Sequence, residues 1–197
     1  MNDLAKLATL PLAFLCLAGA VDPQPRLTFE GLGPFRIGMT ESELQTRGFT
    51  DPNRSSDWQT DAEYVACHFL ANEEEYPGVG FMINDSKLVR IDIGPNDAGV
   101  EWQTHSGAMI GMTETDIAAI YGNGMQIIDH PYLGDAGSYL VLRSDDGQYM
   151  MIFETAIEDE NSEKFSSAPS RGPNDQKRVT DFRSGLTGPV GYIEGCV

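Results

Sequence analysis

Four kinds of side chain in this sequence could carry chemistry: histidine, paired acids, tryptophan and cysteine. The three histidines are far apart and show neither the i,i+4 spacing nor the Cys-x-x-Cys partners that zinc sites use. They are His68, His105 and His130. This spacing favours structural or surface histidines over metal ligands.

Two neighbouring acids, Asp145 and Asp146, could in principle serve as a general acid and a general base. They are followed by Gly147 and lie between two apolar segments, however, which is the pattern of a hairpin turn. The chain also has no Gly-x-Ser-x-Gly elbow, no Gly-x-Gly-x-x-Gly after a strand and no P-loop. We therefore predict no catalytic, cofactor-binding or metal-binding residues and no cofactor, and we interpret the protein as non-enzymatic.

Trp58 and Trp102 offer a different chemistry, because aromatic faces stack on the apolar faces of sugars. Isolated tryptophans near strand ends more often close a hydrophobic core. A site for a saccharide or another small ligand, lined by either tryptophan, remains an alternative.

The first twenty residues have the features of a signal peptide. An apolar run, Leu7 to Ala20, follows Lys6 and ends in the small residues Ala18-Gly19-Ala20. The run is too short for a membrane span of about 20 apolar residues. We predict removal of residues 1–20, a mature chain that begins at Val21, and a bacterial periplasmic or secreted location.

A lipoprotein is the alternative at this end of the chain. It would use Cys16 as the acylated residue, but Phe14 and Leu15 occupy positions where such sites need small residues.

Two cysteines, Cys67 and Cys196, lie in the predicted mature chain. An even count in an exported protein favours one disulfide. Two free thiols, one of them a nucleophile, are the alternative, which an oxidising compartment disfavours.

The net charge of −17 argues against nucleic acid and anionic lipid as partners, because both would repel the chain. The acidity fits a solvated surface or, alternatively, a basic partner or bound cations.

A repeated motif indicates how the chain is organised. "FRIGMTESEL" at 35–44 returns as "AMIGMTETDI" at 108–117. Thr40 with Glu43, and Thr113 with Asp116, have the spacing of a capping box, in which each side chain satisfies a helical N–H. Gly38-Met39-Thr40 and Gly111-Met112-Thr113 are therefore predicted helix starts.

Three strands are predicted after each helix. They comprise 63–70, 79–83 and 88–94 in the first copy, and 138–143, 149–153 and 179–185 in the second. Segments 27–29 and 100–104 could add a leading edge strand to each copy. The predicted fold class is α+β, with two tandem copies of a short helix and a three- to four-stranded antiparallel sheet, at 21–95 and 96–197. About 70 residues barely fill a core alone, so the copies should pack side by side or join their sheets.

The second copy contains an acidic insertion at 156–177, where the first copy has a tight turn. Its composition predicts a solvated loop. Asp159, Asn161 and Glu163 suggest calcium ligands, but they lack the glycine and distant glutamate of a calcium-binding loop.

The helix starts and the order of elements resemble the BamE/SmpA-like and β-lactamase-inhibitory-protein-like superfamily of bacterial exported domains. More closely, several motifs resemble a family of uncharacterised bacterial exported proteins with such tandem repeats. These motifs are Gly31-Leu32-Gly33-Pro34, the IGMT start, Cys67, Pro77-Gly78-Val79, Phe81-Met82, Arg90-Ile91-Asp92 and Tyr192-Ile193-Glu194-Gly195-Cys196. The resemblance supports the Cys67–Cys196 pairing and implies no activity.

Three functional hypotheses follow. The leading one is an exported module that binds another exported or envelope protein through its sheet face and loops. The second, by analogy with BamE-like domains, is envelope structure or assembly. The third is a binder of a small ligand or saccharide.

Overall fold

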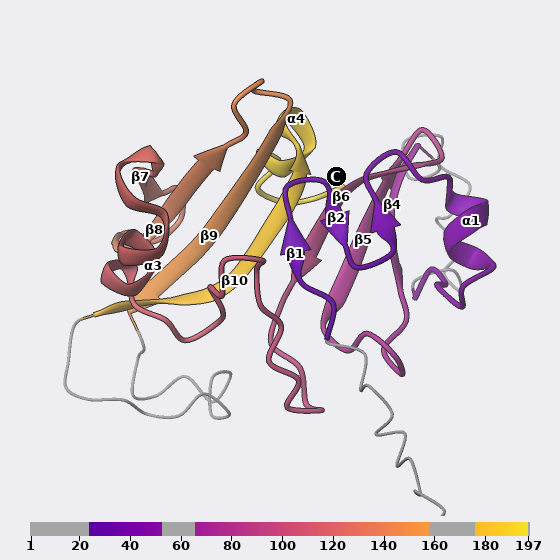
Figure 1. The fold of residues 1–197 in the computed structure, drawn as a ribbon, viewed down its shortest axis with the longest axis horizontal. Coiled ribbons are helices and arrows are strands. Elements are labelled where there is room, and N and C mark those ends of the chain that lie inside the picture. The colour runs from indigo at the N-terminus through magenta and orange to yellow at the C-terminus, as the bar shows by residue number, and fades with distance from the viewer. Residues whose placement is uncertain (1–23, 53–65, 158–175, 197) are drawn as a thin grey trace, which may run out of the picture.

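A computed structural model describes residues 24–52, 66–157 and 176–196. These residues form a mixed fold that is mostly antiparallel sheet, with short helices at the margins (Figure 1). The predicted signal peptide, Cys16, Trp58 and the candidate calcium ligands lie outside the described residues.

The large sheet has seven strands in the order β4-β5-β6-β10-β9-β8-β7, and all neighbours are antiparallel. Its strands are β4 (Cys67–Ala71), β5 (Val79–Asn84), β6 (Lys87–Ile93), β7 (Gln126–His130), β8 (Gly134–Arg143), β9 (Tyr149–Ile157) and β10 (Lys177–Leu186). Strands from the two halves of the chain meet where β6 pairs with β10, from Phe182↔Ile93 to Gly185↔Arg90. The two halves thus share one continuous sheet.

A small sheet packs against one face of the large one (Figure 1). It contains β1 (Leu27–Thr28), β2 (Gly31–Leu32) and β3 (Phe35–Arg36), in that order. Each of these strands buries one large apolar side chain, namely Leu27, Leu32 and Phe35.

The described helices are α1 (Glu41–Gln45), α3 (Glu114–Tyr121) with a 3₁₀ turn (Gly122–Gly124), and α4 (Thr187–Val190). Both α1 and α3 begin with a reciprocal capping box. Thr40 Oγ1 accepts from Glu43 N at 3.3 Å, and the Glu43 carboxylate accepts from Thr40 N at 2.8 Å. The corresponding bonds of Thr113 and Asp116 measure 3.1 and 2.9 Å. Both Gly-Met-Thr motifs therefore lie directly at a helix start.

Each of these helix starts is also tied to a strand of the large sheet. Gly38 N donates to Leu88 O at 2.8 Å, and Leu88 N donates to Met39 O at 2.8 Å. Gly111, Met112 and Val179 form the same pair of bonds at 2.8 and 2.9 Å. Gly38 and Gly111 have φ of 93° and 85°, a conformation in which a Cβ would be strained. The motif thus bonds the chain to a strand of the large sheet and then directs it into a helix.

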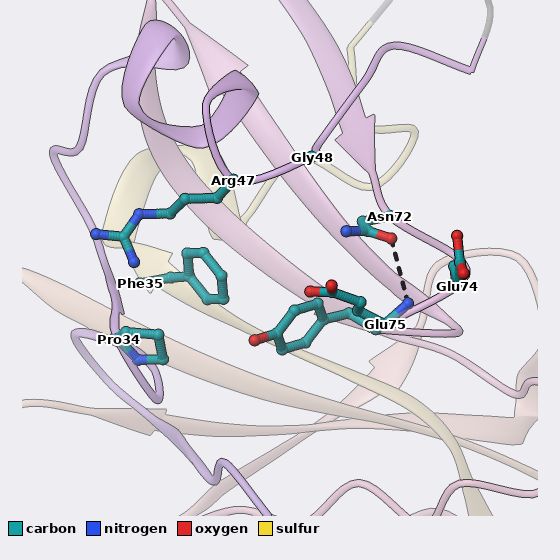
Figure 2. Close-up of a pocket in the computed structure, with 8 residues that line it drawn as sticks. Pro34, Phe35, Arg47, Gly48, Asn72, Glu74 and Glu75 are labelled. Atoms are coloured by element: carbon teal, nitrogen blue, oxygen red, sulfur yellow. Dashed lines mark hydrogen bonds between the residues drawn. The ribbon is translucent and has the colours of Figure 1, made fainter.

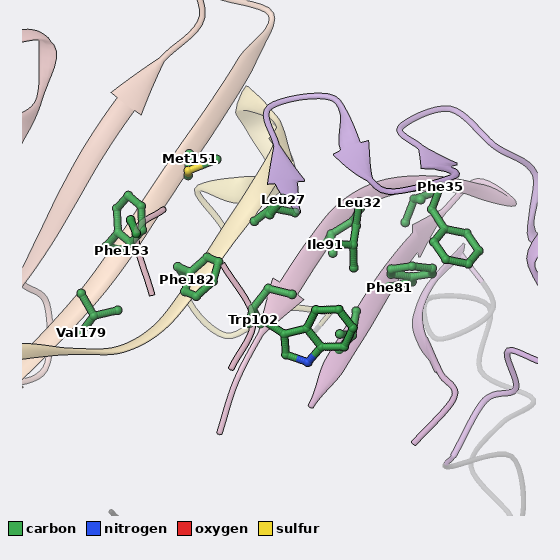
Figure 3. Packing of buried hydrophobic residues seen from close by; sticks show 14 of the residues in the cluster. Leu27, Leu32, Phe35, Phe81, Ile91, Trp102, Met151, Phe153, Val179 and Phe182 are labelled. Carbon is green, nitrogen blue, oxygen red and sulfur yellow. The ribbon is translucent and has the colours of Figure 1, made fainter. Parts of the chain in front are cut away.

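The main core lies between the large sheet and the elements that cover this face (Figure 3). Phe81, Ile91, Phe153 and Phe182 project from the sheet, and Leu32, Phe35 and Trp102 pack over them. In addition, Phe81 stacks on Phe49 with ring centroids 4.4 Å apart. Burial of each such aromatic side chain contributes about 1.5 to 3 kcal/mol, which makes this layer the main source of stability.

The C-terminal segment, residues 187–196, covers part of the opposite face, which we call the outer face. Arg90, buried on β6, donates to Pro189 O at 3.0 Å and to Tyr192 O at 2.8 Å. The predicted disulfide is present, since Cys67 and Cys196 are bonded with Cα atoms 5.4 Å apart. It fixes the end of the chain to the edge strand β4.

The structure corrects several sequence-based predictions. The predicted pattern of two tandem copies, each a helix followed by a sheet, is not evident, because strands from both halves form one seven-stranded sheet. Residues 100–104 form no strand, although Gln103 and Thr104 take part in isolated bridges, among them Leu27↔Thr104. Residues 27–28 belong to the small sheet. Strand β7 was not predicted.

The predicted acidic insertion also has different limits. Ala156 and Ile157 belong to β9, Lys177 belongs to β10, and these strands pair through Lys177↔Ile157 and Arg178↔Ala156. Residues 158–175 lie outside the described residues, so the loop prediction is untested there.

The capping boxes lead to a stability prediction. Thr40→Ala and Thr113→Ala should each lower the free energy of unfolding by about 1 kcal/mol, because each removes the acceptor for a helical N–H. Urea unfolding checks this. The control Ser42→Ala, at an exposed position of α1 outside the cap, should cost nothing measurable. If only one of the two threonine substitutions lowered the free energy of unfolding, the two motifs would not have equivalent roles.

The disulfide leads to a second prediction. Cys196→Ser should lower the melting temperature without abolishing the fold, because the bond closes a loop with a sequence separation of 129. Chain entropy sets an upper figure of about 4 to 5 kcal/mol. The Cys67→Ser/Cys196→Ser double variant should lose no more than either single variant in thermal unfolding. Two alkylatable thiols in the native protein would refute the pairing.

Candidate functional site

The three histidines lie on separate elements. His68 is buried on β4 with Nε2 3.2 Å from Glu41 Oε1, whereas His105 is exposed in the loop before α3. His130 ends β7 and is buried. Throughout 24–52, 66–157 and 176–196, no cluster of three or more His, Cys, Asp or Glu could hold a metal ion.

Trp102 closes the core. It is 5% exposed, its Nε1 donates to Pro77 O at 2.7 Å, and its ring stacks on Tyr76. It therefore cannot wall an open saccharide site.

Asp145 and Asp146 lie in the predicted hairpin turn between β8 and β9. The Asp146 carboxylate accepts from Ser144 Oγ at 2.6 Å and from Gln148 N at 3.0 Å. The hydrogen bond from Ser144 lowers the pKa of Asp146. This acid is stabilised as an anion within a turn and is poorly suited to donate a proton.

A polar hollow of about 610 Å³ lies beside α1 (Figure 2). Arg47 extends over the Phe35 ring on one side, 5.7 Å from its centroid, while Glu74 and Glu75 lie across the hollow. All three charged side chains are exposed. Exposed charges of both signs are well solvated, and they define no preferred ligand.

A second hollow, which we call the outer groove, lies on the outer face of β7, β8 and β9 and has a volume of about 310 Å³. Apolar side chains form much of its surface, and the C-terminal segment closes one side. Its lining residues are Gln126, Ile128, Asp129, Pro131, Tyr139, Val141, Arg143, Met150, Ile152, Gly191 and Ile193.

Exposed apolar side chains gather around this groove. Six of the seven large ones among the described residues lie on β7, on the turn after it, or on the C-terminal segment, and all three elements line the groove. They are Ile127 (56% exposed), Ile128 (50%), Tyr132 (64%), Leu133 (45%), Tyr192 (48%) and Ile193 (44%). Of these residues, Ile128 and Ile193 line the groove, whereas Ile127 points to the opposite face of β7, because side chains alternate along a strand. Exposed apolar side chains that gather in one region are typical of interaction surfaces.

A buried cluster of charges supports the groove. The Arg183 guanidinium, 4% exposed, lies 5.1 Å from the centre of the Tyr139 ring that lines the groove. Its Nε donates to Val190 O at 2.9 Å, and its Nη1 donates to Glu154 at 3.1 Å. Arg183 thereby links β10 with β9 and with the C-terminal segment.

His130 joins the same cluster from β7. Its Nδ1 accepts from Tyr132 N and Leu133 N at 3.1 and 3.2 Å, so the ring proton resides on Nε2. Nε2 then donates to Glu154 Oε1 at 2.6 Å. The hydrogen bonds of this histidine hold the apolar turn at 131–133 against the sheet.

Burial and the nearby charge of Glu154 raise the pKa of Asp181, next to Arg183 on the outer face, to about 7. Burial also raises the pKa of Asp92 on β6, although Arg90 and Arg183 oppose the shift. The two arginines thus compensate desolvated acids along the centre of the sheet.

One contact resembles a nucleophile with its base. Lys177 Nζ donates to Ser138 Oγ at 2.9 Å and to Gly137 O at 3.2 Å. Ser138 is only 2% exposed, however, so its hydroxyl cannot reach a substrate. The contact ties β10 to β8 across β9.

Sequence reasoning missed the outer groove. The available signal was three apolar pairs, Ile127-Ile128, Tyr132-Leu133 and Tyr192-Ile193, outside the predicted core strands. No spacing rule shows that they meet, because 126–133 and 191–193 approach one another only in the folded chain.

Comparison with protein families, curated proteins and solved structures finds no match. The likeness to BamE/SmpA-like domains therefore stays a prediction. None of the helices in the described ranges is both long and apolar enough to cross a membrane.

The raised pKa of Asp181 predicts how stability depends on pH. The folded state holds this proton more tightly than the unfolded chain, whose aspartates titrate near 4, so ionisation costs stability as pH rises from about 4 to about 7. Asp181→Asn should flatten this decline in urea unfolding.

Asp146→Asn is the matched control, because the pKa of Asp146 is lowered. Removing the Asp146 carboxylate should change stability only at low pH and should leave the decline in stability toward pH 7 unchanged. An equal decline in the natural chain and in Asp181→Asn would contradict the role assigned to Asp181.

Proposed function

We propose that this protein is an exported, non-enzymatic module that binds another exported or envelope protein through the outer groove. The observation that carries the proposal is the gathering of exposed apolar side chains around this groove, at one end of the large sheet. Water-exposed apolar area of this kind is removed from solvent when a protein partner binds.

The shape of the groove favours a protein over a small molecule. Its volume, about 310 Å³, is at the low end for small-ligand pockets, and its apolar rim extends beyond it onto Tyr132, Leu133 and Tyr192. A rim of this extent suits a partner surface better than an enclosed ligand. Of the two tryptophans that could line a saccharide site, Trp102 is buried, and Trp58 lies outside the described residues.

The polar side chains near the groove favour binding over catalysis. His130, Glu154 and Arg183 are engaged with one another and with backbone groups, and they hold the groove in shape. They therefore provide support without presenting a reactive group.

Two features support export as part of the proposal. The apolar run at 7–20 is typical of a signal peptide. The Cys67–Cys196 bond is suited to an oxidising compartment such as the periplasm or the extracellular space. A role in envelope assembly would use the same surface.

We also infer that the chain consists of two tandem copies whose sheets have merged. Supporting this, the bonds of Gly38 and Met39 to Leu88 recur as those of Gly111 and Met112 to Val179. Bridges Thr40↔Lys87 and Thr113↔Arg178 follow the same correspondence. The helix starts are offset by 73 positions and the strands by 91, which places the additional length between β9 and β10.

Site-specific photo-crosslinking in cells tests the proposed function. A photoreactive amino acid at position 128, in the groove, should yield a defined protein adduct in the envelope fraction. The same group at Asp97, in an exposed turn that does not line the groove, should not. Equal adducts at both positions, or none at position 128, would refute binding through the groove.

A further inference from the structure

We infer that the partner binds as an extended segment that adds an eighth strand to the large sheet beside β7, with apolar side chains alternating with lysine or arginine. The inference rests on the proposed function and goes further, because it specifies the conformation and the chemistry of the bound segment. Its basis is the edge of β7 with which no described strand pairs, the groove next to that edge and the acidity of the chain.

The two edges of the large sheet differ in whether their backbone groups are available to pair with an added strand. Across the edge strand β4, Thr50 and Ala71 exchange backbone hydrogen bonds at 2.9 and 2.8 Å, and Cys67 carries the disulfide. Strand β7 pairs with β8 on one side, and no described strand pairs with its other side. A row of backbone N–H and C=O groups on an open edge is a template for an added strand.

The sequence of β7, Gln-Ile-Ile-Asp-His, lacks the proline and lysine with which edge strands commonly block such pairing. A register shift between Asp129 and His130 limits the regular part to Gln126–Asp129. An added strand can therefore form only a short ladder, and side-chain contacts must supply much of the affinity.

The groove supplies these contacts on one face. Gln126 and Ile128 pair with Val141 and Tyr139 of β8, and all four side chains line the groove. In an added strand, the residue opposite Ile128 would place its Cβ about 5 Å away on the same face. Because side chains alternate, every second residue of the bound segment would point into the groove and should be apolar.

Charge selects the other residues of the segment. These residues would point to the opposite face of the added strand, the face of Asp129, which is exposed and follows Ile128 on β7. The whole chain has a net charge of −17, which disfavours a second copy of itself as the occupant. A segment with lysine or arginine at alternate positions complements this field.

Nuclear magnetic resonance of the disulfide-bonded chain tests the inference with a synthetic peptide of alternating lysine and valine. The peptide should shift the backbone amide signals of Gln126–Asp129 and slow their hydrogen exchange. Two isomers of this peptide, each N-methylated on a different set of alternate residues, distinguish strand addition from apolar contact alone. Methyl groups on the edge that faces β7 should abolish binding, and methyl groups on the opposite edge should be tolerated.

Variants test the groove and the charge separately. Ile128→Lys should weaken peptide binding by about tenfold or more, equivalent to about 1.4 kcal/mol, and Asp129→Lys should weaken it as well. Ile157→Lys changes an isoleucine on β9 that is 38% exposed and outside the groove, so its affinity should match that of the natural chain. Unfolding curves establish that each variant is folded.

Three results would overturn the inference: equal binding of both N-methylated isomers, equal binding of a glutamate–valine peptide, or concentration-dependent dimerisation that occupies β7. Should crosslinking through position 128 succeed while the lysine–valine peptide leaves the β7 amides unshifted, the proposed function would stand and strand addition would fail.

Discussion

The antiparallel pairing of β6 with β10 is the contact on which the rest of the molecule depends. It joins strands from the two halves of the chain and so allows one core to span both. The approach is close at Gly185, where an added Cβ would lie 2.2 Å from Val89 O. A side chain at Gly185 would therefore push the strands apart and divide the core.

The same pairing determines what the outer face contains. It places Arg183 opposite Asp92 and Gly185 opposite Arg90, so two buried arginines and a desolvated acid share the middle of the sheet. Buried charges need partners, and the C-terminal segment supplies carbonyl oxygens to both arginines, from Pro189, Val190 and Tyr192. The segment held in this way forms one wall of the outer groove.

The parts of this fold that depend on local chemistry could be predicted from the sequence. A hydroxyl with a carboxylate three residues on specifies a helix start, and Asp146-Gly147 between apolar runs specifies a hairpin. The pairing of Cys67 with Cys196 followed because the predicted mature chain contains no other cysteine. The groove could not be predicted, because Ile128 and Ile193 come to line the same hollow only through tertiary contacts such as those of Arg183 and His130. Strand β7 was missed for a related reason, since four of its five residues are exposed and give no burial pattern.

The contrast between the two sheet edges connects this architecture to binding. Strand β4 is bonded to Thr50 and, through the disulfide, to Cys196, whereas no strand in the described part of the chain pairs with the far side of β7, which carries two exposed isoleucines. Such an edge favours self-association, which the net charge of −17 on each copy opposes. The same charge attracts a basic segment. In the proposed binding mode, the acidity of the chain disfavours pairing between identical copies and leaves the backbone of β7 available to a partner of opposite charge.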